Sequence, residues 1–165
     1  MTCGGEVTLF FERAGPPSWR VAVFGAGHCS QALVRLLLTL DCAITVVDPR
    51  PEWLARLPSD PRLRAVAADH HDPPAGASAV VMTQGHRTDV PVLRALLPRE
   101  DLAFVGAIGS RSKASTLRRE LAGLGEAALA RLVCPIGLDL GGDSPPEIAV
   151  SVAAQLLQVR DRRAP

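Results

Sequence analysis

Gly25, Gly27 and Asp48 are the residues of this chain whose types and spacing first suggest chemistry. The two glycines follow the apolar run Val21–Phe24, and Asp48 closes a second apolar run 23 positions after Gly25. Glycine at the first position allows a tight turn, and glycine at the second lets the backbone approach a diphosphate at the start of a helix. The downstream carboxylate would accept hydrogen bonds from a ribose hydroxyl. The spacing therefore predicts a dinucleotide-type site.

Three neighbouring residues modify this prediction. The third glycine position of the pattern holds Ser30, which is small enough for helix–strand contact but departs from the glycine typical of tight nucleotide binding. Arg50 stands beside Asp48, so a ribose 2′-hydroxyl and a 2′-phosphate both remain open as ligands. His28 falls on the first helical turn, where capping and ligand contact are equally open.

Two further turns carry groups that suit an anion. Gly109–Lys113 offers flexible backbone, two hydroxyls and two cations at a predicted helix start, although a helix cap with solvated charges is the alternative. Thr83–Arg87 follows another apolar run. Because the carboxyl ends of parallel strands meet at one edge, we expect these turns to converge on one pocket. The predicted cofactor-binding residues are Gly25, Ala26, Gly27, His28, Asp48, Arg50, Thr83, Gly109, Ser110, Arg111 and Lys113.

Alternating strands and helices must position these turns. The pattern predicts an α/β, Rossmann-like, doubly wound and mostly parallel sheet with an extra N-terminal strand. Residues 1–18 would form an N-terminal Cys-Gly-Gly turn and strand, and residues 19–165 the Rossmann-like domain. Strands are expected over 7–12, 20–24, 43–48, 63–67, 78–82, 103–106 and 131–136. Helices are expected over 28–40, 88–97, from the Gly109 turn to about Leu124, and from Ser144 through Leu157, with at most a short one within 50–57.

Composition narrows the function classes. The 165 residues are 47% apolar, enough for a full core, and 18 basic residues nearly balance 17 acidic ones. Without a net field and with only 4% aromatic residues, neither nucleic acid nor an anionic membrane is expected as a partner. The first residues lack the basic and apolar regions of a signal peptide, so the expected location is cytoplasmic.

The four cysteines show no zinc-type spacing. Cys29, Cys42 and Cys134 fall in or beside predicted core elements, where packing is the expected role. Cys3 instead stands in a short Gly-rich turn, where its thiol would be exposed unless something covers it.

The ordered motifs resemble those of the xanthine dehydrogenase accessory proteins, the XdhC/CoxI type, over essentially the whole chain. The motifs that carry the resemblance are Met1-Thr-Cys-Gly-Gly-Glu-Val7, Val23-Phe-Gly-Ala-Gly-His28, Val47-Asp-Pro-Arg50, Val81-Met-Thr83, Phe104-Val-Gly-Ala-Ile-Gly-Ser-Arg111, Cys134-Pro-Ile-Gly-Leu138 and Pro146-Glu-Ile-Ala149. The resemblance implies an accessory protein rather than an enzyme. Such a protein binds the molybdenum cofactor (molybdopterin), guards it during sulfuration and passes it to a xanthine dehydrogenase-type molybdenum hydroxylase.

By the same resemblance, Cys3 would contact the molybdenum of the bound cofactor, since thiolate is a soft donor. A cysteine desulfurase would be a second partner. The competing interpretations are an NAD(P)-dependent oxidoreductase, favoured by the glycine pattern and Asp48, and a nucleotide-sensing regulatory domain. A homodimer is also expected, because the predicted Val7–Glu12 strand has no obvious partner within the domain.

Overall fold

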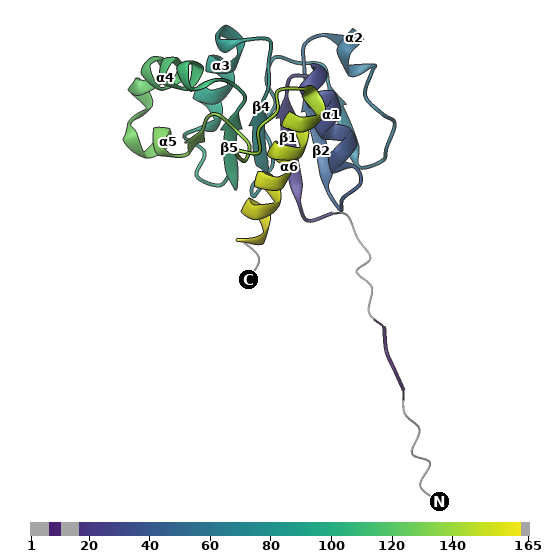
Figure 1. The fold of residues 1–165 in the computed structure, drawn as a ribbon. Helices are drawn as coiled ribbons and strands as arrows, with labels where there is room; N and C mark the ends of the chain where they lie inside the picture. The colour runs from purple at the N-terminus through teal and green to yellow at the C-terminus, as the bar shows by residue number, and fades with distance from the viewer. Residues whose placement is uncertain (1–6, 11–16, 163–165) are drawn as a thin grey trace, which may run out of the picture.

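A six-stranded parallel sheet forms the centre of the protein (Figure 1). The computed structural model describes residues 7–10 and 17–162. The strands lie in the order β3-β2-β1-β4-β5-β6, and every pair of neighbours is parallel. Their bounds are β1 Arg20–Phe24, β2 Ala43–Val47, β3 Leu63–Val66, β4 Ser78–Val81, β5 Phe104–Ala107 and β6 Leu132–Val133. The Rossmann-like fold predicted from the sequence is confirmed.

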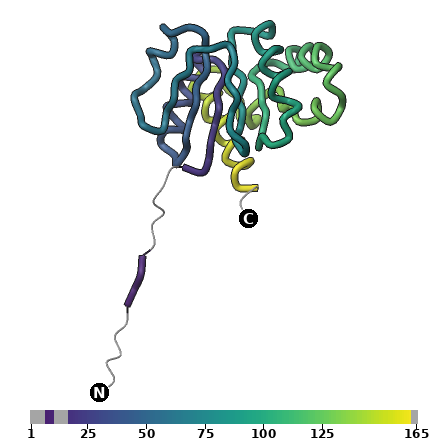
Figure 2. Tube along the Cα trace, turned by 180° about the vertical axis from the view of Figure 1, so that it is seen from behind, coloured from purple at the N-terminus to yellow at the C-terminus, as the bar shows by residue number. Residues whose placement is uncertain are grey.

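Helices cover both faces of the sheet, as the front and back views show (Figures 1 and 2). One face carries α1 and α6, which pack against each other, and the other carries α3 and α4. The helices are α1 His28–Leu37, α2 Pro51–Leu54, α3 His86–Leu96, α4 Arg111–Glu120, α5 Glu126–Ala130 and α6 Pro145–Asp161. No helix within the described ranges is long and apolar enough to cross a membrane.

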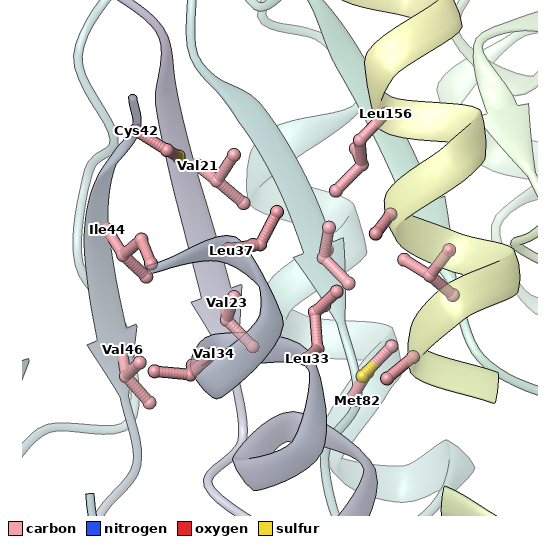
Figure 3. Packing of buried hydrophobic residues seen from close by; sticks show 14 of the residues in the cluster. Val21, Val23, Leu33, Val34, Leu37, Cys42, Ile44, Val46, Met82 and Leu156 are labelled. Atoms are coloured by element: carbon pink, nitrogen blue, oxygen red, sulfur yellow. The ribbon is translucent and has the colours of Figure 1, made fainter. Parts of the chain in front are cut away.

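The alternating residues of each strand divide between two cores. On the first face, Val21 and Val23 of β1 pack with Leu33 and Leu37 of α1 and with Leu156 of α6 (Figure 3). On the opposite face, the intervening strand residues meet α3 and α4 in a second buried cluster. Because β1, β4 and β5 are covered on both sides, they read as continuous apolar runs, and this is why their positions could be predicted.

The strand order creates a crevice at one edge of the sheet. β1 pairs with β2 on one side and with β4 on the other, so the chain reverses its direction of winding between β1 and β4. In doubly wound sheets, ligands bind outside the carboxyl ends of the strands at this switch point. The Gly25, Asp48, Thr83 and Gly109 turns all follow the carboxyl ends of strands and therefore share this edge.

Several element boundaries differ from the prediction. The first helix ends at Leu37, α3 begins at His86, and the last strand is only Leu132–Val133. The helix predicted to about Leu124 ends at Glu120 and is followed by a 3₁₀ turn at Ala122–Leu124, and helix α5 falls where no helix was predicted. The N-terminal strand expected over residues 7–12 falls partly outside the described residues, and residues 7–10 are not assigned to a strand.

Candidate functional site

The turn between β1 and α1 depends on Gly25. Its φ is +102°, and a Cβ atom there would lie 2.2 Å from the carbonyl oxygen of Met82. The Gly25 N–H donates to the Val47 carbonyl at 2.7 Å, which ties the turn to the end of β2. Glycine is thus required at this position by backbone conformation and by close packing.

Gly27 differs from Gly25, because neither its backbone conformation nor the packing of the described residues requires a glycine there. Its φ is −67°, and apart from its immediate chain neighbours no described atom lies within 4 Å of a Cβ built on it. Gly27 is also the N-cap residue of α1, whose first backbone N–H groups form the positive end of the helix. The missing side chain leaves this helix end open to a ligand. His28 follows it, exposed, with its ring edge-on to Trp53 at 5.1 Å between centroids.

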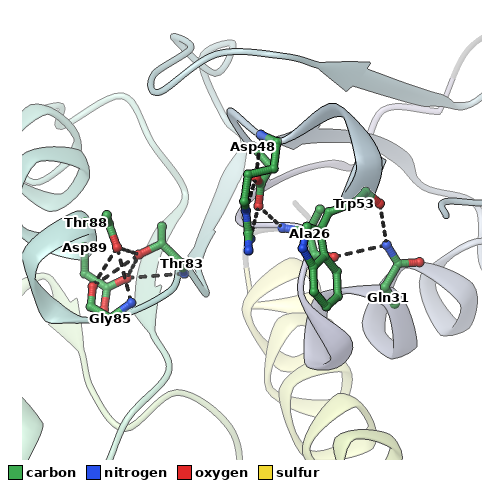
Figure 4. A network of polar contacts seen from close by, with 9 residues as sticks. Ala26, Gln31, Asp48, Trp53, Thr83, Gly85, Thr88 and Asp89 are labelled. Carbon is green, nitrogen blue, oxygen red and sulfur yellow. Dashed lines mark hydrogen bonds and ion pairs between the residues drawn. The ribbon is translucent and has the colours of Figure 1, made fainter. Parts of the chain in front are cut away.

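Asp48 closes the Gly25 turn from the end of β2, and its carboxyl group is only 2% exposed. One oxygen, Oδ2, accepts from the Ala26 N–H and from Arg50 Nη2, both at 2.7 Å (Figure 4). The other, Oδ1, accepts from the Arg50 N–H at 2.9 Å and from Arg50 Nε at 2.8 Å. The predicted ribose acceptor therefore already has four donors within the chain.

These contacts set the ionisation of Asp48. Burial raises the pKa of its carboxyl group, but the Arg50 side chain and the backbone N–H groups of Ala26 and Arg50 lower it by more, so the pKa lies below its ordinary value. Asp48 is consequently a carboxylate at neutral pH and holds Arg50 in one orientation.

Arg50 is held from three sides. Besides Asp48, the amide oxygen of Gln84, when turned toward the guanidinium, lies 2.7 Å from Nη1. The guanidinium carbon lies 5.1 Å from the centroid of the Trp53 ring, and Arg56 approaches the same ring at 4.4 Å. Arg50 remains 25% exposed. It is an oriented cation at the surface of the crevice.

A cavity of about 260 Å³ opens beside this cation, between the ends of β1, β2 and β4 and the start of α3. Its wall combines apolar surface with hydroxyl, amide and charged groups. The lining residues are Phe24, Gly25, Val47, Asp48, Pro49, Arg50, Asp69, Thr83, Gln84, Arg87, Thr88, Pro91 and Val92. We call this cavity the switch-point cleft. Such a wall suits a ligand with an anionic group and a flat apolar part.

Thr83, which lines the cleft, belongs to a second network of polar contacts (Figure 4). Asp89, which has no exposed side-chain surface, accepts from the Thr83 hydroxyl at 2.5 Å and from its backbone N–H at 3.3 Å. The Thr83 and Thr88 hydroxyls lie 2.6 Å apart. The other Asp89 oxygen forms an ion pair with Lys113 Nζ at 2.5 Å. This network joins the turn after β4 to α3 and α4.

The Gly109–Lys113 turn does not join the switch-point cleft. Lys113 is engaged by Asp89, and its aliphatic chain covers Gly109 so closely that a Cβ there would meet it at 2.5 Å. Ser110 is the N-cap of α4 and accepts from the Lys113 N–H at 3.2 Å, while Arg111 is exposed. The helix-cap alternative describes this turn better than the predicted anion cradle does.

The predicted site residues thus fall into separate places. Gly25, Asp48, Arg50 and Thr83 line the switch-point cleft. Gly109 lines a second cavity of about 320 Å³, between the end of β5 and the loop before α6. Ala26 is buried and donates to Asp48, while Gly27 and His28 lie at the start of α1. Cys3, the predicted molybdenum contact, lies outside the described residues.

The sequence did not predict several residues of this site, among them Gln84, Arg87, Trp53 and Asp69. Gln84 and Arg87 belong to the turn already selected at Thr83, but only Thr83 was predicted to bind. Trp53, which stacks on Arg50, follows a proline-rich stretch that gave no sign of a site. Asp69 lines the cleft after β3, and its position at a strand end was the available signal.

Comparison with known proteins finds one matching family model and several relatives of this chain. The family model for the XdhC Rossmann domain matches residues 21–156. The uncharacterized protein YqeB of Escherichia coli K12 is 30% identical over 96% of this chain and 30% of its own length. A probable xanthine dehydrogenase subunit from Bacillus subtilis 168 is 28% identical over 95% of this chain and 48% of its own.

One solved structure agrees with these relatives. The crystal structure of a xanthine dehydrogenase from Bacillus halodurans superposes with a TM-score of 0.75 at 25% identity, covering 90% of this chain and 44% of that one. The chain therefore spans less than half the length of each of these three proteins.

Proposed function

Since this chain belongs to the XdhC Rossmann-domain family, we propose that it is an accessory protein that binds the molybdenum cofactor for a xanthine dehydrogenase-type molybdenum hydroxylase. In this role it would hold the cofactor during sulfuration and then pass it to the hydroxylase. The names of the Bacillus subtilis and Bacillus halodurans proteins support the link to xanthine dehydrogenase.

The observation that carries this proposal is the switch-point cleft beside the open turn at Gly27. The cofactor is a pterin that bears a phosphate, and bound cofactor would supply the molybdenum centre to the hydroxylase. Arg50 and Arg87 line the cleft and match the phosphate in charge, while Phe24 and Val92 offer apolar surface to the pterin. At Gly27 a Cβ atom would point into open space, so the backbone remains accessible there.

The described cysteines are poor candidates for the molybdenum contact. Burial raises the pKa of the Cys29 and Cys134 thiols and raises that of Cys42 to about 12. A thiol rather than a thiolate is then the dominant form at neutral pH. Within residues 7–10 and 17–162, no group of three or more His, Cys, Asp or Glu side chains is placed to hold a metal ion. Cys3, assigned by the family resemblance, therefore stays the proposed contact.

Replacement of Cys3 by alanine should lower cofactor retention at least about tenfold. This factor corresponds to the loss of one bond that contributes about 1.4 kcal/mol or more to binding. The melting temperature should stay nearly unchanged. The measurement is molybdenum and pterin content after gel filtration of the full chain with the cofactor. Cys42→Ala is the matched control, because Cys42 is fully buried. It should lower the melting temperature and retain the cofactor. Normal retention by Cys3→Ala would remove the central residue of the proposal.

The proposed partners include a cysteine desulfurase and a second copy of this chain. Val7, Leu9 and Phe10 are 77%, 70% and 90% exposed, a run of apolar side chains that a partner would cover. We propose that the homodimer buries this segment.

Light scattering at high micromolar concentration should give twice the chain mass of 17.4 kDa. Phe10→Ser should shift the equilibrium toward the monomer, because it removes the most exposed of the three apolar side chains. Val150→Ser, at an apolar residue of α6 that is 50% exposed, is the control and should leave the mass unchanged. A wild-type monomer would rule the homodimer out.

A further inference from the structure

We infer that the switch-point cleft recognises a phosphomonoester, rather than the ribose diol that the carboxylate after β2 binds in many dinucleotide-binding folds. The inference rests on the proposed function in that it names the group by which the cleft would hold the cofactor. A second source of the same group is a nucleotide that carries a 2′-phosphate.

Asp48 has no acceptor capacity left for a diol. A carboxylate offers about four lone-pair sites, and Asp48 receives four hydrogen bonds, from the Ala26 N–H and from three nitrogens of Arg50. All four lie between 2.7 and 2.9 Å, and the carboxyl group is 2% exposed. A ribose hydroxyl could bind Asp48 only by displacing one of these donors, and three of the four are nitrogens of Arg50.

Arg50 has donors left over. Its side chain carries five N–H groups. Nε and Nη2 each donate once to Asp48, and Nη1 reaches the Gln84 amide oxygen. Within the described residues this leaves one N–H on each terminal nitrogen, a pair that matches two oxygens of a phosphate. Because Asp48, Gln84 and Trp53 already fix the guanidinium, little side-chain entropy is lost when a ligand binds.

The remaining charges of the cleft are Arg87 and Asp69, which are both exposed. The Asp48–Arg50 pair carries no net charge, so Arg50 acts through its oriented N–H donors, while Arg87 adds attraction for an anion and Asp69 adds repulsion. Both effects are weakened by water, so Arg50 is the main determinant and the other two adjust the affinity. The Thr83 and Thr88 hydroxyls line the same wall and add uncharged hydrogen-bonding groups.

Calorimetry on the full chain with matched ligand pairs tests the inference. NADP⁺ against NAD⁺ and 2′-AMP against adenosine add only a 2′-phosphate, and molybdopterin against its dephosphorylated form tests the pterin source. In at least one pair the phosphomonoester should bind about 10- to 100-fold more tightly, as expected for charge-assisted hydrogen bonds. Its affinity should rise from pH 5 to 7.5, because the second phosphate pKa is about 6.

Variants identify the residues responsible. Arg50→Met should remove most of the preference, Arg87→Ala should reduce it, and Asp69→Asn should increase it. Arg56→Ala is the control, since Arg56 stacks on the same Trp53 ring and does not line the cleft. Should Arg50→Met fail to fold, the exposed Arg87 and Asp69 variants carry the test.

The inference is wrong if no phosphomonoester binds better than its unphosphorylated counterpart, or if Arg56→Ala removes the preference as Arg50→Met does. The outcome is separable from that of the proposed function. Preference for NADP⁺ without cofactor retention would support the inference and overturn the chaperone role. Equal binding of molybdopterin with and without its phosphate, together with no preference in either nucleotide pair, would overturn the inference and leave the chaperone role standing.

Discussion

Gly25→Ala should lower the free energy of unfolding by about 3–5 kcal/mol, because two effects act at once. The φ of +102° is strained for any residue with a Cβ atom. That Cβ would also lie 2.2 Å from the Met82 carbonyl oxygen, a backbone atom beside the end of β4 that cannot move without disturbing the sheet. Urea denaturation followed by circular dichroism measures the change, and the melting temperature should fall by roughly 10 °C.

Gly27→Ala is the matched control for this prediction. Its Cβ meets no atom of the described residues within 4 Å, chain neighbours aside, and its φ is −67°. The stability change should therefore stay near the roughly 0.5–1 kcal/mol that alanine costs at an N-cap. Ligand binding, in contrast, should weaken, because the methyl group occupies the open helix end. Equal destabilisation by the two substitutions would contradict the distinction drawn between the two glycines.

Asp48→Asn should lower the free energy of unfolding at pH 7 by about 2–3 kcal/mol. The substitution removes a buried carboxylate that accepts from the Ala26 N–H and from Arg50, and it leaves the guanidinium without its charged partner. Part of the full cost of breaking a buried pair is avoided, because Arg50 is 25% exposed and can be solvated. Denaturant titrations of wild type and variant at matched pH give the difference.

The same pair of proteins has a predictable pH dependence. The pKa of Asp48 is lowered in the folded state, so its contribution is fully present above the unfolded pKa, about 4. It is lost as the pH falls through the folded pKa. The stability gap between wild type and Asp48→Asn should therefore shrink below about pH 4. A gap that widened in acid would contradict the assigned direction of the pKa shift.

The sequence predicted the strands well for a physical reason. β1 was predicted residue for residue, because an apolar run that ends in Gly25 has few alternatives to a buried parallel strand. The start of α6 was predicted equally well, because helix capping depends only on residues close in sequence. Pro145 is the first residue of the helix, and the Glu147 carboxylate accepts from the Ser144 N–H at 3.1 Å. Helix α5 was missed because its five residues are too few to show a helical period.

The candidate site was predicted only in part, because roles depend on side chains that are distant in sequence. The position of Asp48 was identified, but the sequence does not reveal the rotamer of Arg50. That rotamer is what brings the guanidinium onto both oxygens of the Asp48 carboxylate. Lys113 looked like a free cation until the fold brought Asp89, 24 residues away, against it. Gly25 and Gly27 are both glycines, so the sequence alone does not distinguish their roles. The structure shows that the backbone needs a glycine at Gly25, whereas Gly27 leaves room for a ligand.

The ion pair between Lys113 and Asp89 has a consequence for the chemical labelling of this protein. Lys113 is the only lysine in the chain, and its amine rests on a carboxylate with no exposed surface. The amine must leave this carboxylate before it can react with an acylating reagent, and rotation of the side chain is enough, because 21% of the Lys113 side chain is exposed. The acylation rate of one side chain would thus report how often the ion pair between α3 and α4 breaks.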